Sequence, residues 1–114
     1  MKFKCNNTEY EIIEKEQLEN DEYVGLTEYQ NKRVLLKKLD RDFMIRTLKH
    51  ELAHVWMYEY GHNQDEKEFN NEDVCEIVAC SNDFINEVVK QYKEELFQEI
   101  EDKANEIDKM ITSD

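Results

Sequence analysis

Proline is absent from this chain of 114 residues, and glycine occurs only twice. A glycine-rich loop that cradles phosphate groups needs several closely spaced glycines, so a nucleotide site of that kind is excluded. The chain also lacks internal repeats, low-complexity segments and a Ser/His/Asp arrangement suited to nucleophilic catalysis. Any chemistry is therefore expected to be concentrated in one place.

Cysteine is scarce as well. The three cysteines are Cys5, Cys75 and Cys80, an odd number that contains no Cys-x-x-Cys pair. Neither a disulfide framework nor a sulfur-ligated zinc site is indicated by this pattern. We expect reduced thiols, with Cys75 acting as a small buried side chain in a helix interface.

Long hydrophobic runs are missing too. A membrane-spanning helix needs about 18 consecutive apolar residues, and no such run occurs in the chain. The residues after Met1 do not form the apolar core of a secretory signal. We therefore expect no membrane association and predict a cytoplasmic location.

Basic residues are outnumbered by acidic ones, 15 against 28, which leaves a formal net charge of −13. Such a surface repels a phosphate backbone, so direct binding to nucleic acid is not expected. The length corresponds to a single domain over residues 1–114, since domains usually contain about 100 to 150 residues.

The most informative stretch is His50-Glu51-Leu52-Ala53-His54. In a helix, residues four apart are separated by only about 40° around the axis, so His50 and His54 can face one metal ion. Neutral imidazole binds zinc well, and a catalytic zinc site takes three protein ligands and leaves one position for water. This spacing is a metallopeptidase signature, with Glu51 as the general base.

The motif requires a helix beneath it, and the surrounding pattern predicts one over residues 40–60. Asp40 or Asp42 can cap its start, and Gly61 marks its end. A surface helix with incidental histidines is the alternative. Opposite the histidines lies an apolar stripe of Ile45, Leu48, Leu52, Val55 and Trp56.

A third ligand is expected from the acidic segment 71–76, which reads Asn-Glu-Asp-Val-Cys-Glu. If this segment opens a second helix, Glu72 and Glu76 share one face. One of them can then bind zinc while the other supports a ligand histidine. The residues alone do not decide which acid takes which role.

Taken together, residues 40 to 80 resemble a gluzincin, a zinc peptidase whose histidine helix is followed by a helix carrying Asn-Glu-x-x-Ser/Ala-Asp. Small phage-type and ImmA/IrrE-like peptidases are similar. The resemblance implies that Glu72 is the third zinc ligand and that Glu76 supports a histidine. Cys75 and Glu76 depart from the family pattern, which has Ser or Ala and then Asp at those positions.

A metzincin is excluded by spacing. That family needs Gly three residues and His six residues after the second histidine, and this chain has Met57 and Tyr60 there. Tyr60, Tyr58 or the loop histidine His62 could stabilise a developing oxyanion. For His62, an ordinary solvated loop residue is the competing interpretation.

Residues 1–39 are predicted to be strand-rich, because β-branched and aromatic residues recur between turn formers. Segments 2–5 and 10–14 would form one hairpin, and segments 23–29 and 33–38 a second, giving antiparallel strands. In zincins a strand with a free edge beside the cleft can pair with an extended substrate. Segment 33–38 is the leading candidate for that strand, since it leads directly into the motif helix, but the residues alone do not decide which strand lies at the edge.

Beyond Cys80, helical spacing of apolar residues continues to about residue 110. Ser81, Asn82 and Asp83 would cap a new helix or mark a kink in a continuing one. A helix from there to residue 110 is on the order of 40 Å long, more than the width of such a domain. Its end would therefore project, fold back or pack on another chain, and we expect fraying from about Ala104.

The predicted fold class is thus α+β, a small zincin-like domain with N-terminal antiparallel strands, an active-site helix, a glutamate helix and a long C-terminal helix. The predicted function is zinc-dependent hydrolysis of peptide bonds in a peptide or protein substrate. The alternative is a non-catalytic, phage-type regulatory module that retains zinc or only the fold. Glu51 argues against this alternative, whereas the small size of the chain argues for it.

Overall fold

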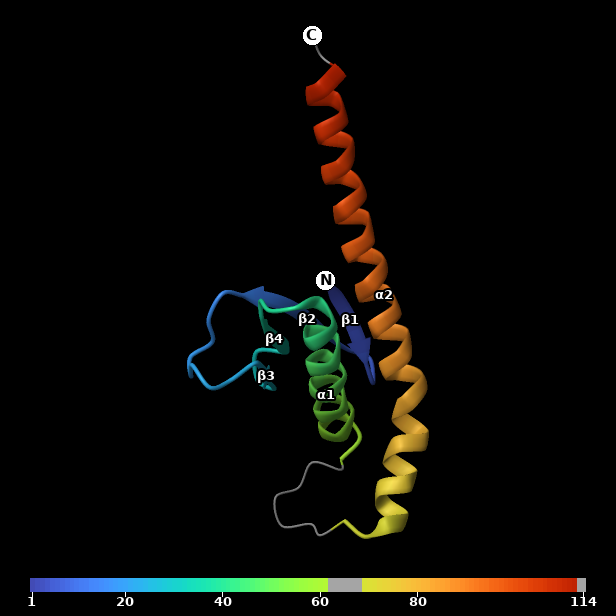
Figure 1. Cartoon of the computed structure of the whole chain (residues 1–114). Helices are drawn as coiled ribbons and strands as arrows, with labels where there is room; N and C mark the ends of the chain where they lie inside the picture. The colour runs from blue at the N-terminus through green and yellow to red at the C-terminus, as the bar shows by residue number, and fades with distance from the viewer. Residues whose placement is uncertain (62–68, 113–114) are drawn as a thin grey trace.

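The computed structural model describes residues 1–61 and 69–112. Within them the chain is mixed α+β, a four-stranded sheet followed by two helices, the second of them long (Figure 1). The elements are β1 (Lys2–Cys5), β2 (Thr8–Lys15), β3 (Gly25–Glu28), β4 (Arg33–Lys37), α1 (Arg41–Glu59) and α2 (Asn71–Thr112).

Both predicted hairpins are confirmed. β1 pairs antiparallel with β2, and the two strands are joined through Asn6 and Asn7, whose φ angles are 50° and 63°. Asparagine tolerates this left-handed conformation, which a two-residue turn of matching twist requires. β3 pairs antiparallel with β4, and the connection contains Lys32 with φ 55°.

The sheet as a whole is not antiparallel, and segment 33–38 does not form its edge. The strand order is β1-β2-β4-β3, with β2 and β4 parallel and Ile12 opposite Val34. The correction has a physical reason, since Val34, Leu35 and Leu36 are all buried. A strand that buries consecutive side chains needs cover on both faces, which favours an interior position. The edge beside β4 is β3.

The predicted separation into a glutamate helix and a C-terminal helix is also wrong. α2 runs from Asn71 to Thr112 as one helix, and it continues through Ser81, which is only 4% exposed. No glycine or proline occurs in this range to end it. The helix also continues past Ala104.

α1 begins where predicted, with the Asp40 side chain accepting a hydrogen bond from the Phe43 backbone N–H. It covers one face of the sheet, and α2 packs beside it (Figure 1). Phe3 of β1 contacts the rings of Tyr10 and Phe84, with centroids 5.5 and 6.0 Å away, which ties the first hairpin to α2. The core comprises Phe3, Cys5, Tyr10, Ile12, Val34, Leu36, Met44, Leu48, Leu52, Val55, Trp56, Val88, Val89 and Tyr92.

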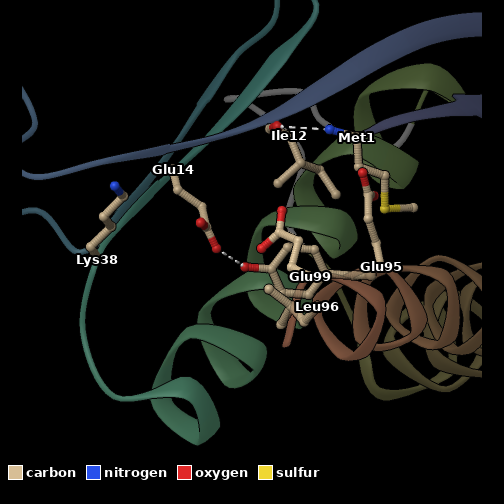
Figure 2. A pocket seen from close by; sticks show the side chains of 8 residues that line it. Met1, Ile12, Glu14, Lys38, Glu95, Leu96 and Glu99 are labelled. Atoms are coloured by element: carbon tan, nitrogen blue, oxygen red, sulfur yellow. Dashed lines mark hydrogen bonds between the residues drawn. The ribbon is translucent and has the colours of Figure 1, made fainter. Parts of the chain in front are cut away.

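The second half of α2 extends past the rest of the molecule, so its end projects and does not fold back (Figure 1). Where it departs, the Tyr92 hydroxyl donates to Glu14 Oε1 at 2.5 Å (Figure 2). A pocket of about 270 Å³ lies at this junction, and no histidine lines it. Further along, Phe97, Ile100 and Ile107 are exposed.

The three thiols are free. Cys5 is buried, and burial together with the nearby Glu59 charge raises its pKa to about 11. Cys75 is exposed, so the prediction of a buried interface residue is wrong. Among the described residues, no helix combines the length and the apolar composition that crossing a membrane requires.

Glu59, in the last turn of α1, holds the first hairpin in place. Its side chain is 9% exposed, Oε2 accepts a hydrogen bond from the Tyr10 hydroxyl, and Lys32 Nζ lies 3.6 Å away. The Asn6 side-chain amide donates to the Glu59 carbonyl at 3.0 Å. Burial alone would raise the pKa of Glu59, but hydrogen bonds from Tyr10 and Thr8 and the Lys32 charge outweigh it, and the pKa is lowered.

Glu59→Gln is expected to lower the free energy of unfolding by about 1 kcal/mol at pH 7, because a charge-assisted hydrogen bond becomes a neutral one. A lowered folded-state pKa contributes stability above the unfolded pKa of about 4.3. That contribution is lost as pH falls through the folded value. Urea denaturation should therefore show a gap between wild type and variant that is constant above about pH 5 and narrows in acid.

Glu16→Gln is the matched control, because the Glu16–Lys38 pair is exposed and carries little energy. Glu16→Gln should leave the free energy of unfolding unchanged both at neutral pH and in acid. If the difference in the free energy of unfolding between wild type and Glu59→Gln widened in acid, the stabilising role of the Glu59 carboxylate would be contradicted.

Candidate metal centre

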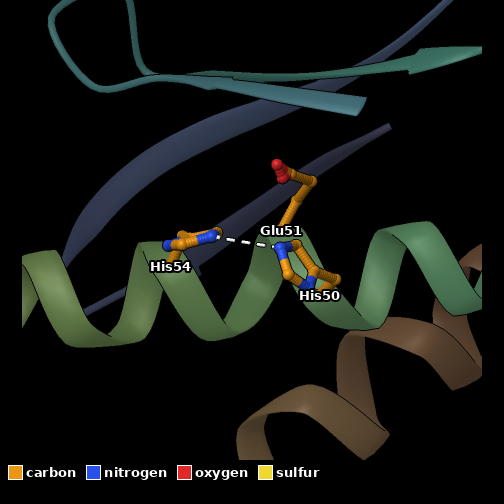
Figure 3. Close-up of side chains that lie close together, drawn as sticks. All are labelled: His50, Glu51 and His54. Atoms are coloured by element: carbon orange, nitrogen blue, oxygen red, sulfur yellow. Dashed lines mark hydrogen bonds between the residues drawn. The ribbon is translucent and has the colours of Figure 1, made fainter. Parts of the chain in front are cut away.

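One face of α1 gathers the three residues of the sequence motif. His50, Glu51 and His54 each offer a ligand atom, and these atoms all lie within 4.8 Å of one another (Figure 3). The motif is held on a regular helix, since α1 is unbroken from Arg41 to Glu59. A possible metal-binding group of two imidazoles and a carboxylate is therefore present, as the sequence predicted.

The two imidazoles point their Nε2 atoms at each other across one helical turn. The distance between His50 Nε2 and His54 Nε2 is 3.2 Å. Two nitrogen atoms bound to one tetrahedral zinc ion lie about 3.3 Å apart, because each Zn–N bond is about 2.0 to 2.1 Å. The same distance also fits one N–H···N hydrogen bond between opposite tautomers. The pair is thus spaced as metal ligands are, without rearrangement of the helix.

Glu51 points toward the sheet, with a carboxylate oxygen still within 4.8 Å of a ring nitrogen of each histidine (Figure 3). The residue is 6% exposed, and its Oε2 atom has no hydrogen-bond partner among the described residues. Burial raises the pKa of Glu51, and the opposing effect of His54 and His50 is smaller. A buried carboxylate oxygen without a partner is costly, and such atoms occur where a ligand or a reaction uses them. This donor set, two imidazoles with an adjacent carboxylate, fits zinc.

Gly25 explains how the sheet reaches this carboxylate. A Cβ atom at Gly25 would lie 2.5 Å from Thr47 Cγ2 and 3.2 Å from Glu51 Cγ. Only glycine therefore allows the first residue of β3 to pack directly on α1 at this point. Thr27, on the same strand, donates a hydrogen bond to the Glu51 carbonyl at 3.5 Å. The edge strand and the motif are thus in direct contact.

A groove of about 380 Å³ opens beside the motif, between α1 and the segment that leads into β3. On the α1 side it includes Arg46, which lies one turn before His50. Both sides of the groove meet at Gly25 and Glu51. Its lining residues are Glu22, Tyr23, Val24, Gly25, Arg46, Thr47, His50 and Glu51.

The structure does not bring the predicted acids into the group. Glu72 and Glu76 are exposed in the first turns of α2, and neither belongs to the cluster formed by the three motif residues. Their roles as zinc ligand and as supporting acid stay predictions. Gly25 and Arg46, which border the groove beside the motif, were not predicted from the sequence as residues of the site. The spacing of Arg46 from His50 was a usable signal, whereas the approach of β3 to α1 is a tertiary contact that no local pattern reports.

Two of the three residues considered as oxyanion stabilisers make contacts with other aromatic rings. The Tyr58 ring stacks on Tyr29 with centroids 4.4 Å apart, and Tyr60 packs on Trp56 at 5.0 Å. His62 falls outside the described residues.

Comparisons of the whole chain with protein-family models, with curated proteins and with solved structures gave no match. The resemblance to gluzincins therefore rests on the sequence pattern, while the geometry shows a possible metal-binding group of His50, Glu51 and His54.

Gly25→Ala is expected to lower the free energy of unfolding by about 1 to 3 kcal/mol, the usual cost of overpacking. The backbone of Gly25 has no positive φ, so the effect isolates the steric clash. Thr47→Ser removes the clashing methyl group and keeps the hydroxyl that donates to the Phe43 carbonyl. In urea denaturation the double variant should recover much of the loss. Additive losses would show that the clash is not the cause.

Glu51→Met is expected to raise the free energy of unfolding of the metal-free protein by about 1 to 3 kcal/mol, because it removes a buried, unpartnered polar group at similar volume. Urea denaturation in EDTA measures the change, with Glu9→Met, at an exposed position, as the control. A lower stability than wild type would show that Glu51 serves the fold rather than a reaction.

Proposed function

We propose that this chain is a zinc-dependent metallopeptidase domain that hydrolyses peptide bonds in a peptide or protein substrate. One observation carries the proposal: two imidazole Nε2 atoms lie 3.2 Å apart on one helix, and the residue between them presents a buried carboxylate oxygen without a partner. A merely structural pair of histidines would not require that carboxylate. A general base beside a metal requires it.

In the proposed reaction, His50 and His54 would hold a zinc ion. That ion, when bound, would acidify a water molecule and polarise the substrate carbonyl. The Glu51 carboxylate would accept a proton from the water and pass it to the leaving amine. The raised pKa of Glu51 suits a group that must hold a proton between these two steps.

The edge position of β3 supports the proposal from the substrate side. An extended peptide can add to a free strand edge through backbone hydrogen bonds. β3 lies at the edge of the sheet and contacts the Glu51 backbone through Thr27. A peptide paired with β3 would run along the groove that Gly25 and His50 border. This assignment replaces β4, which the sheet encloses.

A second candidate function is the non-catalytic zinc-binding module. The position of Glu72 favours it, because a catalytic zinc site takes three protein ligands and Glu72 does not belong to the group formed by the motif residues. The unpartnered Oε2 atom of Glu51 favours catalysis. Variants of Glu51 separate the two candidates.

Purified wild-type protein is expected to bind one zinc ion per chain, with nitrogen and oxygen ligation in X-ray absorption. His50→Ala and His54→Ala should each abolish retention of the metal through gel filtration. Glu51→Gln should keep the zinc but lose about two to four orders of magnitude in hydrolysis of a protein substrate such as casein. Hydrolysis at the wild-type rate by Glu51→Gln would remove Glu51 from the role of general base. Zinc binding without any hydrolysis by the wild type would reject the peptidase and leave the binding module.

Glu72→Ala and Glu76→Ala form a matched pair on the same helix face. If Glu72 binds the metal, its loss should release zinc. Loss of a supporting acid at position 76 should weaken binding by only about 10- to 100-fold. Equal zinc affinity in Glu72→Ala and wild type would remove Glu72 from the ligand set.

A further inference from the structure

A third pocket is lined mainly by basic residues, although the molecule as a whole is acidic. It has a volume of about 310 Å³ and lies between α1 and α2. α1 contributes Lys49, while α2 contributes two lysines, one acid and a short apolar floor. The lining residues are Lys49, Asn86, Val89, Lys90, Lys93 and Glu94. Three basic groups thus face one acidic group, although acids outnumber bases almost two to one in the whole chain.

The pocket adjoins the metal centre through Arg46. This residue lines the groove beside His50, and it lies three positions before Lys49 on α1. Residues three and four apart on a helix are neighbours on its surface. Arg46, Lys49, Lys90 and Lys93 therefore form a basic strip that leads from the motif to α2.

Among the described residues, Glu94 is the one acid that lines the pocket formed by the three lysines of the basic strip. None of the four members of the strip forms an ion pair within the described part of the chain, even though the protein offers many carboxylates. Ion pairs within the described residues do involve Lys32, Arg33, Lys38 and Arg41. Exposed cations left unpaired in an acidic protein, and gathered beside a candidate site, suit an anionic ligand.

We propose that the basic strip binds an acidic peptide segment. Carboxylate side chains match the lysine ammonium groups, Asn86 offers an amide donor, and Val89 supports the aliphatic part of a Glu or Asp side chain. At physiological ionic strength the screening length is about 8 Å, so distant acids of the protein repel such a segment only weakly. A long nucleic acid would meet the acidic surface beyond the strip.

The location of the strip extends the site described above. A peptide that pairs with β3 passes Arg46, and the acidic segment would then lie on one side of the cleaved bond. The statement that this segment belongs to a substrate rests on the proposed function. The statement that the strip binds acidic peptides does not.

Binding is tested on the full chain in EDTA with a short fluorescein-labelled peptide rich in Asp and Glu, followed by fluorescence anisotropy. Lys90→Glu should weaken binding about tenfold, since reversal replaces attraction by repulsion. Lys103→Glu is the matched control, an exposed lysine on the same helix outside this pocket. It should change the affinity by less than about twofold.

Equal weakening by Lys90→Glu and Lys103→Glu would overturn the proposal, because it would show a diffuse charge effect. Tighter binding of a single-stranded oligonucleotide than of the acidic peptide would overturn it in favour of nucleic acid. Because these measurements contain no metal, a failure of zinc binding or hydrolysis leaves their outcome unaffected. Conversely, a failure of the acidic peptide to bind leaves the results of the zinc-binding and hydrolysis measurements unaffected.

Discussion

The close contact between β3 and α1 is the constraint on which the rest of the site depends. Gly25 lets the strand backbone touch the helix where Thr47 and Glu51 project, and any larger residue would hold the two apart. This contact buries Glu51 and places an edge strand beside the histidines. Both consequences follow from one missing side chain, so the geometry of the candidate metal centre is set by packing rather than by the motif alone.

The core behind α1 offsets the cost of burying that carboxylate. Leu48, Leu52 and Val55 are completely buried on the face of α1 that packs in the core. Each such side chain stabilises the fold by about 1.5 to 3 kcal/mol, so the three together exceed the penalty of about 1 to 3 kcal/mol for one unpartnered polar atom. The helix can therefore carry the buried Glu51 carboxylate without losing its position. Functional sites commonly hold such locally unfavourable groups.

Much of the fold was predictable from local patterns. The α1 helix follows from its apolar stripe and from Asp40, and the first hairpin follows from Asn6 and Asn7. The order of the strands was not predicted, although the buried run from Val34 to Leu36 is the mark of an interior strand. The continuity of α2 was missed because polar residues after Cys80 looked like a cap, and only packing around Ser81 overrides that reading.

The candidate site, like the fold, was predictable from the sequence only in part. Helical spacing alone predicts that His50, Glu51 and His54 lie together, because one turn of a helix fixes their separation. The burial of Glu51 and the groove beside it depend on β3, which is distant in sequence, so no local pattern could predict them. Glu72 was assigned by family resemblance, and its exposed position shows that such a role depends on how α2 sits against α1.

The projecting part of α2 has a consequence for how the molecule moves in solution. The radius of gyration is 17.2 Å, whereas a compact domain of this length has about 13 Å. A body of 66 × 30 × 24 Å tumbles faster about its long axis than across it. A single chain therefore has the hydrodynamic drag of a heavier sphere, and only a measurement of mass, such as light scattering, distinguishes one elongated copy from two compact ones.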